Sequence, residues 1–410
     1  MTVTPTGSRS SEAPAYPMAR GCPYRMPDGY EQLRADGPLS RVTLYDGRKV
    51  WLVSGSAEGR ALLLDPRVSV DVRHPSFPAL TPQSAEQAEA GFAPPLSGVD
   101  DPEHAHQRRM VIPAFGVRRI AALRPRIEGF AEELVDAMLA RGDRADLVAA
   151  YSLPLACAAN FALLGVPEDD GRYIAERTRQ VLAPSDGNAP GEAGKLFGEI
   201  LTRLRDLVAR KERQPGTGLI DDLLVARPDE GGMAGDQLVA LCAILLAGGD
   251  DTTSSTIAAA TLALLEHPDQ LEKLRRDPEL TPGAVDELTR LTSVADVLPR
   301  VATADIELAG HTIRDGDGVL VSLMLMNRDP GTWQEPDALD IHRRAGRHVA
   351  FGYGIHQCVG QNLARAVIET ALTVLLRRVP TLRLAVPADQ VRANPPYVLQ
   401  GSLSALPVAW

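Results

Sequence analysis

Apolar residues recur at spacings of three and four along much of the chain, which is the pattern of helices that bury one face. This periodicity predicts four long helices, over residues 118–141, 195–212, 237–266 and 360–379. Within the third, an apolar run at 238–249 is followed by the polar residues 250–256 before apolar residues resume. A membrane span needs about 20 apolar residues without such a break. We therefore expect a buried, interrupted helix here and no membrane anchor.

Two segments show the alternation of apolar and polar positions that is typical of strands. In residues 41–53, Asp46-Gly47 separates two apolar runs, which predicts a hairpin with a tight turn. Residues 303–322 carry the turn residues Gly310, Asp315 and Gly316. The sequence therefore predicts a mainly α fold with a small β portion.

Loops rich in glycine and proline separate these elements, at residues 73–102, 184–194 and 327–350. Long loops in a compact protein commonly act as lids or as walls of a binding site. The chain has no internal repeat and no long charged linker. We expect a single domain over residues 1–410, with residues 1–15 disordered.

The composition limits the functions that fit. With 410 residues, 44% of them hydrophobic, the chain can bury a large core. A formal charge of −10 argues against a nucleic-acid partner, because phosphate binding requires a basic face. The N-terminus lacks the basic and apolar segments of a secretory signal, and four scattered cysteines favour neither disulfides nor a CxxC metal site. We expect a cytoplasmic protein.

One of the cysteines, Cys358, lies in an unusual context, between a loop with glycines at 352 and 354 and a predicted helix. Free backbone N–H groups and the positive end of the helix dipole favour a thiolate at such a position. The glycines allow the chain to bend beside a flat, bulky group. Taken alone, however, a lone cysteine is more often a buried structural residue.

The full string from Phe351 to Gly360, Phe-Gly-Tyr-Gly-Ile-His-Gln-Cys-Val-Gly, resembles the haem-binding loop of cytochrome P450 enzymes, Phe-Gly-x-Gly-x-His-x-Cys-x-Gly. The resemblance covers nearly the whole chain and is closest to actinobacterial members that receive electrons from a ferredoxin. It implies the P450 fold, with haem b (iron protoporphyrin IX) between the interrupted helix and the helix after the cysteine loop. Cys358 would be the axial ligand of the iron, a ligation that favours O–O cleavage.

A second motif of this family is a Glu-x-x-Arg pair, matched here by Glu287 and Arg290. The resemblance implies that Arg343 joins the pair in a structural role beneath the haem. The chain has Leu339-Asp340 where the family usually has Phe-Asp, a mild departure. Without the resemblance, a spacing of three is also that of an ordinary surface ion pair.

The polar interruption at 248–253, Gly-Gly-Asp-Asp-Thr-Thr, resembles the family's Ala/Gly-Gly-x-Asp/Glu-Thr-Thr. It implies two catalytic residues: Asp251 would relay protons, and Thr252 would hold a water molecule or dioxygen. A threonine that bonds back to the preceding turn and bends the helix would explain the same pattern without catalysis. The additional acid, Asp250, leaves open which carboxylate relays protons.

Four residues match positions at which the family binds the haem propionates: His104, Arg108, Arg300 and His356. His104 and Arg108 would share one helical face, where a solvated charged surface is the commoner explanation. His106 competes with His104, but the spacing to Arg108 favours His104.

The family pattern also assigns a substrate pocket. Its predicted lining is Phe92, Leu96, Leu182, Leu245, Gly248, Val294 and Val297. This set favours a medium-to-large apolar small molecule. We expect a haem-thiolate monooxygenase that inserts one atom of O2 by hydroxylation or epoxidation, with a secondary metabolite such as a polyketide or peptide product as substrate. Another oxidative step, such as ring or bond formation, and a promiscuous xenobiotic hydroxylase stay open.

The chain has no flavin-binding segment and no cysteine cluster for iron–sulfur ligation, so the resemblance implies reduction by a ferredoxin with its ferredoxin reductase. We expect a monomer. Five arginines fall on segments near the thiolate side of the family fold and could bind an acidic ferredoxin, although most charged residues are simply solvated. They are Arg109, Arg118, Arg119, Arg344 and Arg347.

Two other classes of protein stay open. A non-catalytic haem gas sensor would keep Cys358 but would not need Asp251 and Thr252. A cysteine hydrolase would pair Cys358 with a histidine base. His356 is only two residues away, however, which rarely gives the right geometry, and the other motifs would then be coincidence.

Overall fold

The computed structural model describes residues 13–410 except 90, 92, 183–191, 226–234 and 395–401. Its helices are α1 (Asp28–Ala35), α2 (Ser56–Leu64), α3 (Pro82–Glu89), α4 (Glu103–Val111), α5 (Val117–Leu139), α6 (Leu153–Leu164), α7 (Glu168–Leu182), α8 (Glu192–Arg213), α9 (Leu219–Val225), α10 (Asp236–Glu266), α11 (Pro268–Arg276), α12 (Thr281–Thr292), α13 (Leu323–Met326) and α14 (Gln361–Arg378). Its strands are β1 (Leu39–Thr43), β2 (Lys49–Val53), β3 (Val68–Ser69), β4 (Arg144–Asp146), β5 (Val297–Ala302), β6 (Ile306–Leu308), β7 (His311–Ile313), β8 (Gly318–Ser322), β9 (Arg383–Leu384) and β10 (Pro407–Ala409).

The predicted hairpin is confirmed. Strands β1 and β2 pair antiparallel from Leu39–Val53 to Thr43–Lys49. They form one edge of a five-stranded sheet with the order β1-β2-β8-β5-β3, in which β2 and β8 run parallel. The second β-like segment of the sequence supplies β8 and the separate two-stranded sheet of β6 and β7.

This sheet is buried on both faces, and the alternation of side chains explains why. On β2, Trp51 and Val53 pack into one apolar cluster with Val319 and Val321 of β8. Val50 and Leu52 point to the opposite face and pack into a second cluster with Leu320. Each strand therefore reads as a nearly continuous apolar run although its residues serve two cores.

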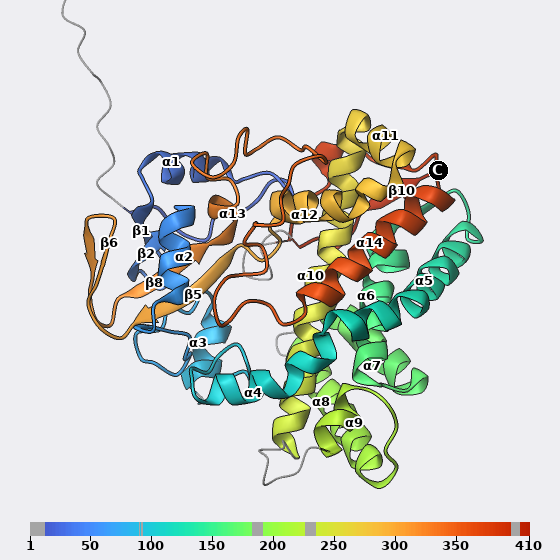
Figure 1. Cartoon of the computed structure of the whole chain (residues 1–410), viewed down its shortest axis with the longest axis horizontal. Helices are drawn as coiled ribbons and strands as arrows, with labels where there is room; N and C mark the ends of the chain where they lie inside the picture. The colour runs from blue at the N-terminus through green and yellow to red at the C-terminus, as the bar shows by residue number, and fades with distance from the viewer. Residues whose placement is uncertain (1–12, 90, 92, 183–191, 226–234, 395–401) are drawn as a thin grey trace, which may run out of the picture.

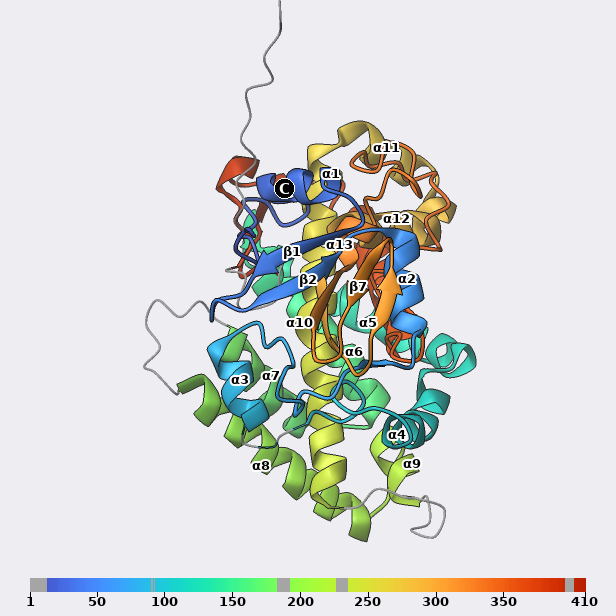
Figure 2. The ribbon, with the colours of Figure 1, turned by 90° about the vertical axis from the view of Figure 1, so that its left-hand side faces the viewer.

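The helices form the larger part of the molecule and pack around α10. The strands of the main sheet lie on one side of α10, while α5, α6 and α14 lie on the other (Figures 1 and 2). Helix α10 packs against α6, α8 and α14, and α14 packs against α5. The four helices predicted from periodicity correspond to α5, α8, α10 and α14.

Two predictions need correction, one on the continuity of α10 and one on disorder at the N-terminus. The polar residues 250–256 interrupt the apolar pattern but not the helix, since α10 runs unbroken from Asp236 to Glu266. The hydroxyls of Thr252 and Thr256 donate to the carbonyls of Gly248 and Thr252, so these side chains satisfy their polar groups within the helix.

The second correction concerns the N-terminus, where disorder was predicted over residues 1–15. Ala15 bridges to Thr43 of β1, and the Thr43 hydroxyl donates to the Ala13 carbonyl at 2.8 Å. Residues 1–12 lie outside the described part of the chain.

Over the described residues, no helix combines the length and hydropathy needed to cross a bilayer.

Candidate cofactor and active site

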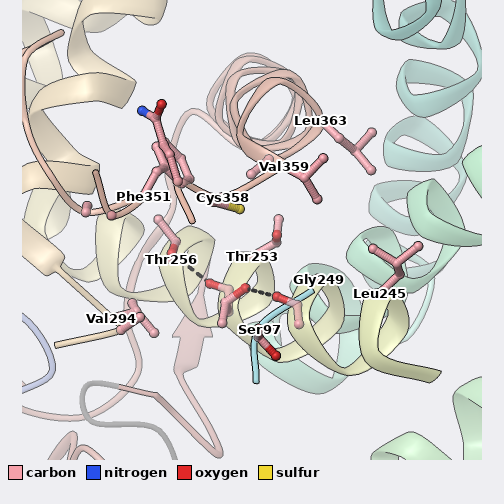
Figure 3. Close-up of a pocket in the computed structure, with 18 of the residues that line it drawn as sticks. Ser97, Leu245, Gly249, Thr253, Thr256, Val294, Phe351, Cys358, Val359 and Leu363 are labelled. Carbon is pink, nitrogen blue, oxygen red and sulfur yellow. Dashed lines mark hydrogen bonds between the residues drawn. The ribbon is translucent and has the colours of Figure 1, made fainter. Parts of the chain in front are cut away.

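A cavity of about 360 Å³ lies between α10 and the loop that precedes α14. Cys358 and Val359 form one wall, and Leu245, Gly249 and Thr253 of α10 form the facing wall (Figure 3). The segment before β5 closes a third side. The cavity thus lies between α10 and the cysteine loop, where the resemblance predicts a haem.

The backbone of the cysteine loop explains its glycines. Gly352 and Gly354 have φ values of +71° and +78°, a region that side chains other than glycine rarely adopt. A Cβ at Gly354 would also meet the Leu63 carbonyl oxygen at 2.5 Å. The Cys358 N–H donates to the Phe351 carbonyl at 2.8 Å and closes the loop immediately before α14.

The Cys358 side chain is exposed, and because the residue lines the cavity, this surface faces the cavity. Burial within the protein raises the pKa of the thiol. The N–H groups of Gly360 and Gln361 and the charges of Arg108 and Arg365 oppose the rise. The helix start therefore favours the thiolate, as predicted, but burial has the larger effect on the pKa.

Basic side chains gather at the edge of the same cavity, and the four predicted propionate-binding residues belong to this group. The rings of His104 and His356 lie 3.9 Å apart between centroids. Arg108, Arg300 and His356 line the cavity. Burial lowers the pKa of Arg300 to about 10 and also lowers that of Arg108.

His104 Nδ1 lies 3.1 Å from Asp101 Oδ1, while no ion pair joins Arg108 or Arg300 to a carboxylate of the described residues. The Arg300 guanidinium donates to the Pro299 carbonyl, and the Nε2 atom of His104 is buried without a hydrogen-bond partner in the described structure. Burial, followed by the charges of His104 and Arg300, lowers the pKa of His356 to about 4. Buried cations are stable only when paired, so this edge fits a ligand with carboxylates, such as the two propionates of haem.

The structure brings the predicted Glu-x-x-Arg group together. Glu287 and Arg290 are both 0% exposed and share two hydrogen bonds of 2.7 and 2.9 Å. Arg343 reaches Glu287 at 3.0 Å, and Arg290 also donates to the carbonyls of Asn327 and Pro336. The group ties α12 to the long loop that leads to Cys358.

The polar residues of α10 point in different directions. Asp250 is 1% exposed and turns toward α6, where Asn160 donates to its Oδ1 at 2.5 Å. Asp251 accepts from the Ser255 hydroxyl at 3.2 Å, and burial raises its pKa. Thr252 lines the cavity. Burial raises the pKa of Asp250 to about 7, so this second acid is the more strongly perturbed of the two.

Four of the seven residues predicted to line the substrate pocket line this cavity. Leu96, Leu245, Gly248 and Val294 line the cavity. Val297 is not among the described lining residues, because alternation along β5 turns it into the cluster on the other sheet face while Leu298 faces the cavity. Phe92 lies outside the described residues, as does the side chain of Leu182, the last residue of α7.

Sequence reasoning missed the part of the wall that α6 supplies, which includes Ala156, Ala159 and Asn160. Helix α6 is apolar almost throughout, so its periodicity does not single out one face. A signal was present in the polar Asn160 within this run. A Cβ at Gly249 would meet its amide nitrogen at 2.4 Å, so the glycine allows Asn160 to approach α10 closely.

Comparison with known proteins agrees with this arrangement. The sequence model of the cytochrome P450 family matches residues 195–391. Pentalenic acid synthase of Streptomyces avermitilis is 48% identical over 408 residues, covering 100% of both chains. Cytochrome P450-SOY of Streptomyces griseus is 46% identical, covering 98% of this chain and 96% of its own.

A solved structure is similar over the same extent. It is the mycinamicin VIII C21 methyl hydroxylase MycCI of Micromonospora griseorubida bound to mycinamicin VIII, with a TM-score of 0.88 and 39% identity. The match covers 97% of this chain and 100% of that one.

The buried Glu287 group generates a stability prediction. Glu287→Gln removes the charge that Arg290 and Arg343 share and leaves Arg290 buried without its counter-charge, so the free energy of unfolding should fall by about 3–5 kcal/mol. Denaturant unfolding measures the change. The matched control is Glu272→Gln, which breaks an exposed pair with Arg276 on α11 and should cost about 0.5 kcal/mol or less. Equal effects of the two substitutions would contradict a buried clamp.

Asp250 generates a pH prediction. Its folded pKa, about 7, lies above its ordinary value, so the folded state keeps a proton that the unfolded state has lost, and the Asp250 contribution to stability falls as pH rises from about 4 to 7. Asp250→Asn removes this dependence. Unfolding free energies of the two proteins should therefore diverge over this window, by up to about 4 kcal/mol in favour of the variant. Parallel curves would show that Asp250 is ionised in the folded protein.

Proposed function

The chain belongs to the cytochrome P450 family, and we propose how its own residues support the monooxygenase reaction of that family. As a member it is an oxidoreductase that uses haem, O2, redox partners and a small-molecule substrate. When bound, the haem supplies an iron that accepts electrons and activates O2. We take the cofactor to be haem b and the whole chain to be one cytoplasmic P450 domain that acts as a monomer.

The observation that carries the proposal is that a thiol on one cavity wall and a group of basic side chains at the cavity edge line the same cavity. Cys358 would ligate the iron, whose charge would hold the sulfur as a thiolate. His104, Arg108, Arg300 and His356 would bind the propionates through charge-assisted hydrogen bonds. The unpartnered His104 Nε2 atom and the lowered pKa of Arg300 support this assignment.

Glu287, Arg290 and Arg343 would act structurally. Their hydrogen bonds fix α12 against the loop that carries Cys358, and the burial of Glu287 and Arg290 makes these contacts costly to break. A thiolate that must stay at one position beneath a rigid cofactor needs such a support.

We assign proton delivery to Asp251 and Thr252. The Thr252 hydroxyl lines the cavity and donates to the Gly248 carbonyl at 2.6 Å, so its oxygen can accept a hydrogen bond from a water molecule in the cavity. The raised pKa of Asp251 means that this acid holds a proton more readily than an exposed carboxyl. Asp250 is the weaker candidate, because its carboxylate turns toward Asn160 of α6.

The substrate would be an apolar small molecule of medium to large size. Leu96, Leu245 and Val294 supply apolar wall, and hydroxylation or epoxidation of a secondary metabolite fits this lining. The names of the relatives support the same class: one is a pentalenic acid synthase and another hydroxylates a methyl group of mycinamicin VIII.

A ferredoxin, reduced by its reductase, would bind at the face outside the cysteine loop. Ile355 of this loop is exposed, and so are Ile112 and Val117. Arg109, Arg118, Arg344 and Arg347 are also exposed, whereas Arg119 pairs with Asp222 of α9 and is partly neutralised. Exposed apolar and basic side chains on these segments would suit an acidic protein.

The proton-delivery assignment predicts the behaviour of Thr252→Ala. Without the hydroxyl, NADPH oxidation should continue while electrons are diverted to hydrogen peroxide, so product formed per NADPH should fall about tenfold or more. The assay uses haem-loaded protein with ferredoxin and reductase, and mycinamicin VIII as the probe. Thr252→Ser keeps a hydroxyl and should retain most of the coupling. Full coupling in Thr252→Ala would overturn the assignment.

The docking assignment predicts a salt-dependent loss of affinity. Arg118→Gln should weaken binding of an acidic ferredoxin several-fold at low ionic strength. At high ionic strength the loss should be smaller, because salt screens the attraction between Arg118 and the ferredoxin already in the wild type. The dissociation constant at two salt concentrations measures this. Arg276→Gln on α11 is the control and should bind as the wild type does. Equal losses in the two variants would rule out a specific basic patch.

A further inference from the structure

Helix α12 carries two adjacent carboxylates, and only the second belongs to the Glu-x-x-Arg motif. Glu287 serves Arg290 and Arg343, as described above. Asp286, one residue earlier, accepts a hydrogen bond from Arg365 Nε of α14 at 2.8 Å. The same oxygen lies 3.5 Å from His348 Nε2, which belongs to the loop leading to Cys358. Asp286 therefore connects three segments around the cysteine loop.

One hydrogen bond of the His348 ring shows which of its nitrogens faces Asp286. Its Nδ1 accepts from the backbone N–H of Ala350 at 3.1 Å, so in the neutral ring the proton is on Nε2, the atom that faces Asp286. Burial lowers the pKa of His348, which favours this neutral form. The charges in the group are then one carboxylate and one guanidinium, on Asp286 and Arg365.

Both partners of Asp286 pack against Phe351. The Arg365 guanidinium carbon lies 4.6 Å from the centroid of the Phe351 ring, and the His348 ring lies 5.4 Å from it at an interplanar angle of 45°. Phe351 in turn accepts the hydrogen bond from Cys358 N–H that closes the loop. Arg365 and His348, the two side chains next to Asp286, thus pack on Phe351, and the Phe351 carbonyl accepts the hydrogen bond from Cys358, the proposed iron ligand.

Charge gives a second connection between this group and the sulfur. Arg365 lies on α14, which starts three residues after Cys358, and its guanidinium packs on Phe351, whose carbonyl accepts from Cys358 N–H, so its positive charge lies on the side of the loop that carries the sulfur. Asp286, paired with Arg365 and only partly exposed, cancels part of that charge. An ordinary surface ion pair would not act in this way, because water would screen it.

We propose that Asp286, Arg365 and His348 form a second clamp beneath the cysteine loop, which sets the positive charge felt by the Cys358 sulfur and thereby tunes the reduction potential of the iron that it would hold. Asp286 is a positioning residue in this proposal, since it acts through Arg365 and Phe351. The proposal rests on the assignment of Cys358 as the axial ligand.

The proposal predicts shifts of opposite sign. Asp286→Asn leaves the Arg365 charge uncompensated, so the reduced state is stabilised and the midpoint potential should become more positive. Arg365→Gln removes the charge, and the potential should become more negative. Arg365→Lys keeps the charge and should lie closer to the wild type than Arg365→Gln does. A purely structural role would lower stability in all three variants without this order.

The experiment is a spectroelectrochemical titration of the haem-loaded, full-length proteins without substrate, with the reduced, carbon-monoxide-bound spectrum recorded for each. Glu369→Gln is the matched control, since Glu369 lies one turn further along α14 and pairs with Arg124 instead. It should leave the potential unchanged. If Asp286→Asn does not fold, the two Arg365 variants still test the charge.

Two results would count against the clamp, and they are distinguishable. A thiolate spectrum in every protein, with potentials that do not move or that move in one direction for Asp286→Asn and Arg365→Gln, would overturn the clamp and leave the proposed function intact. A wild-type protein without the thiolate spectrum would overturn the proposed function and the clamp with it.

Discussion

Charged groups taken out of water must find an opposite charge, and this constraint governs the structure around Cys358. Burial raises the pKa of the thiol, while Arg108 and Arg300 at the edge of the cavity form no ion pair with a carboxylate of the described residues, and His104 Nε2 has no hydrogen-bond partner there. A haem would answer both needs, because its iron would bring positive charge to the sulfur and its propionates would bring negative charge to the basic groups. On the proposed assignment, the thiol would face the iron and the basic residues would face the propionates.

The fold supplies this arrangement by fixing a loop between two rigid helices. Helix α10 forms one wall of the cavity and is continuous, and its threonines satisfy their hydroxyls by bonding back to the preceding turn. Helix α12 supports the opposite side through adjacent carboxylates, Glu287 toward the loop and Asp286 toward α14. These contacts keep the cysteine loop in position while its backbone bends at Gly352 and Gly354.

Much of this could be predicted from sequence, because the signals are local. Periodicity gave the long helices and the first hairpin, and the resemblance to a known family pointed to the cysteine loop and the Glu287 pair. Predictions failed where side-chain direction depends on tertiary contacts. Val297 and Leu298 are both apolar, and only the pairing of β5 in the sheet decides which of them faces the cavity.

Contacts between distant segments were beyond reach for the same reason. Nothing in the sequence pairs Asp250 with Asn160 of α6, 90 residues away. The apolar periodicity around these two residues does not show which way their side chains point. Asp286, His348 and Arg365 come together only because α12, the loop and α14 pack on one another. An aspartate, a histidine and an arginine far apart in the sequence give no indication that they will be in contact in the fold.

The central claim is that Cys358 ligates a haem iron through its thiolate. The most direct test is the absorption spectrum of the purified protein after reduction and exposure to carbon monoxide, compared with that of Cys358→His. The account predicts a strongly red-shifted Soret band in the wild type and its loss in the variant, which can still ligate iron through nitrogen. A wild-type protein that binds no haem, or that shows the same band as Cys358→His, would contradict it.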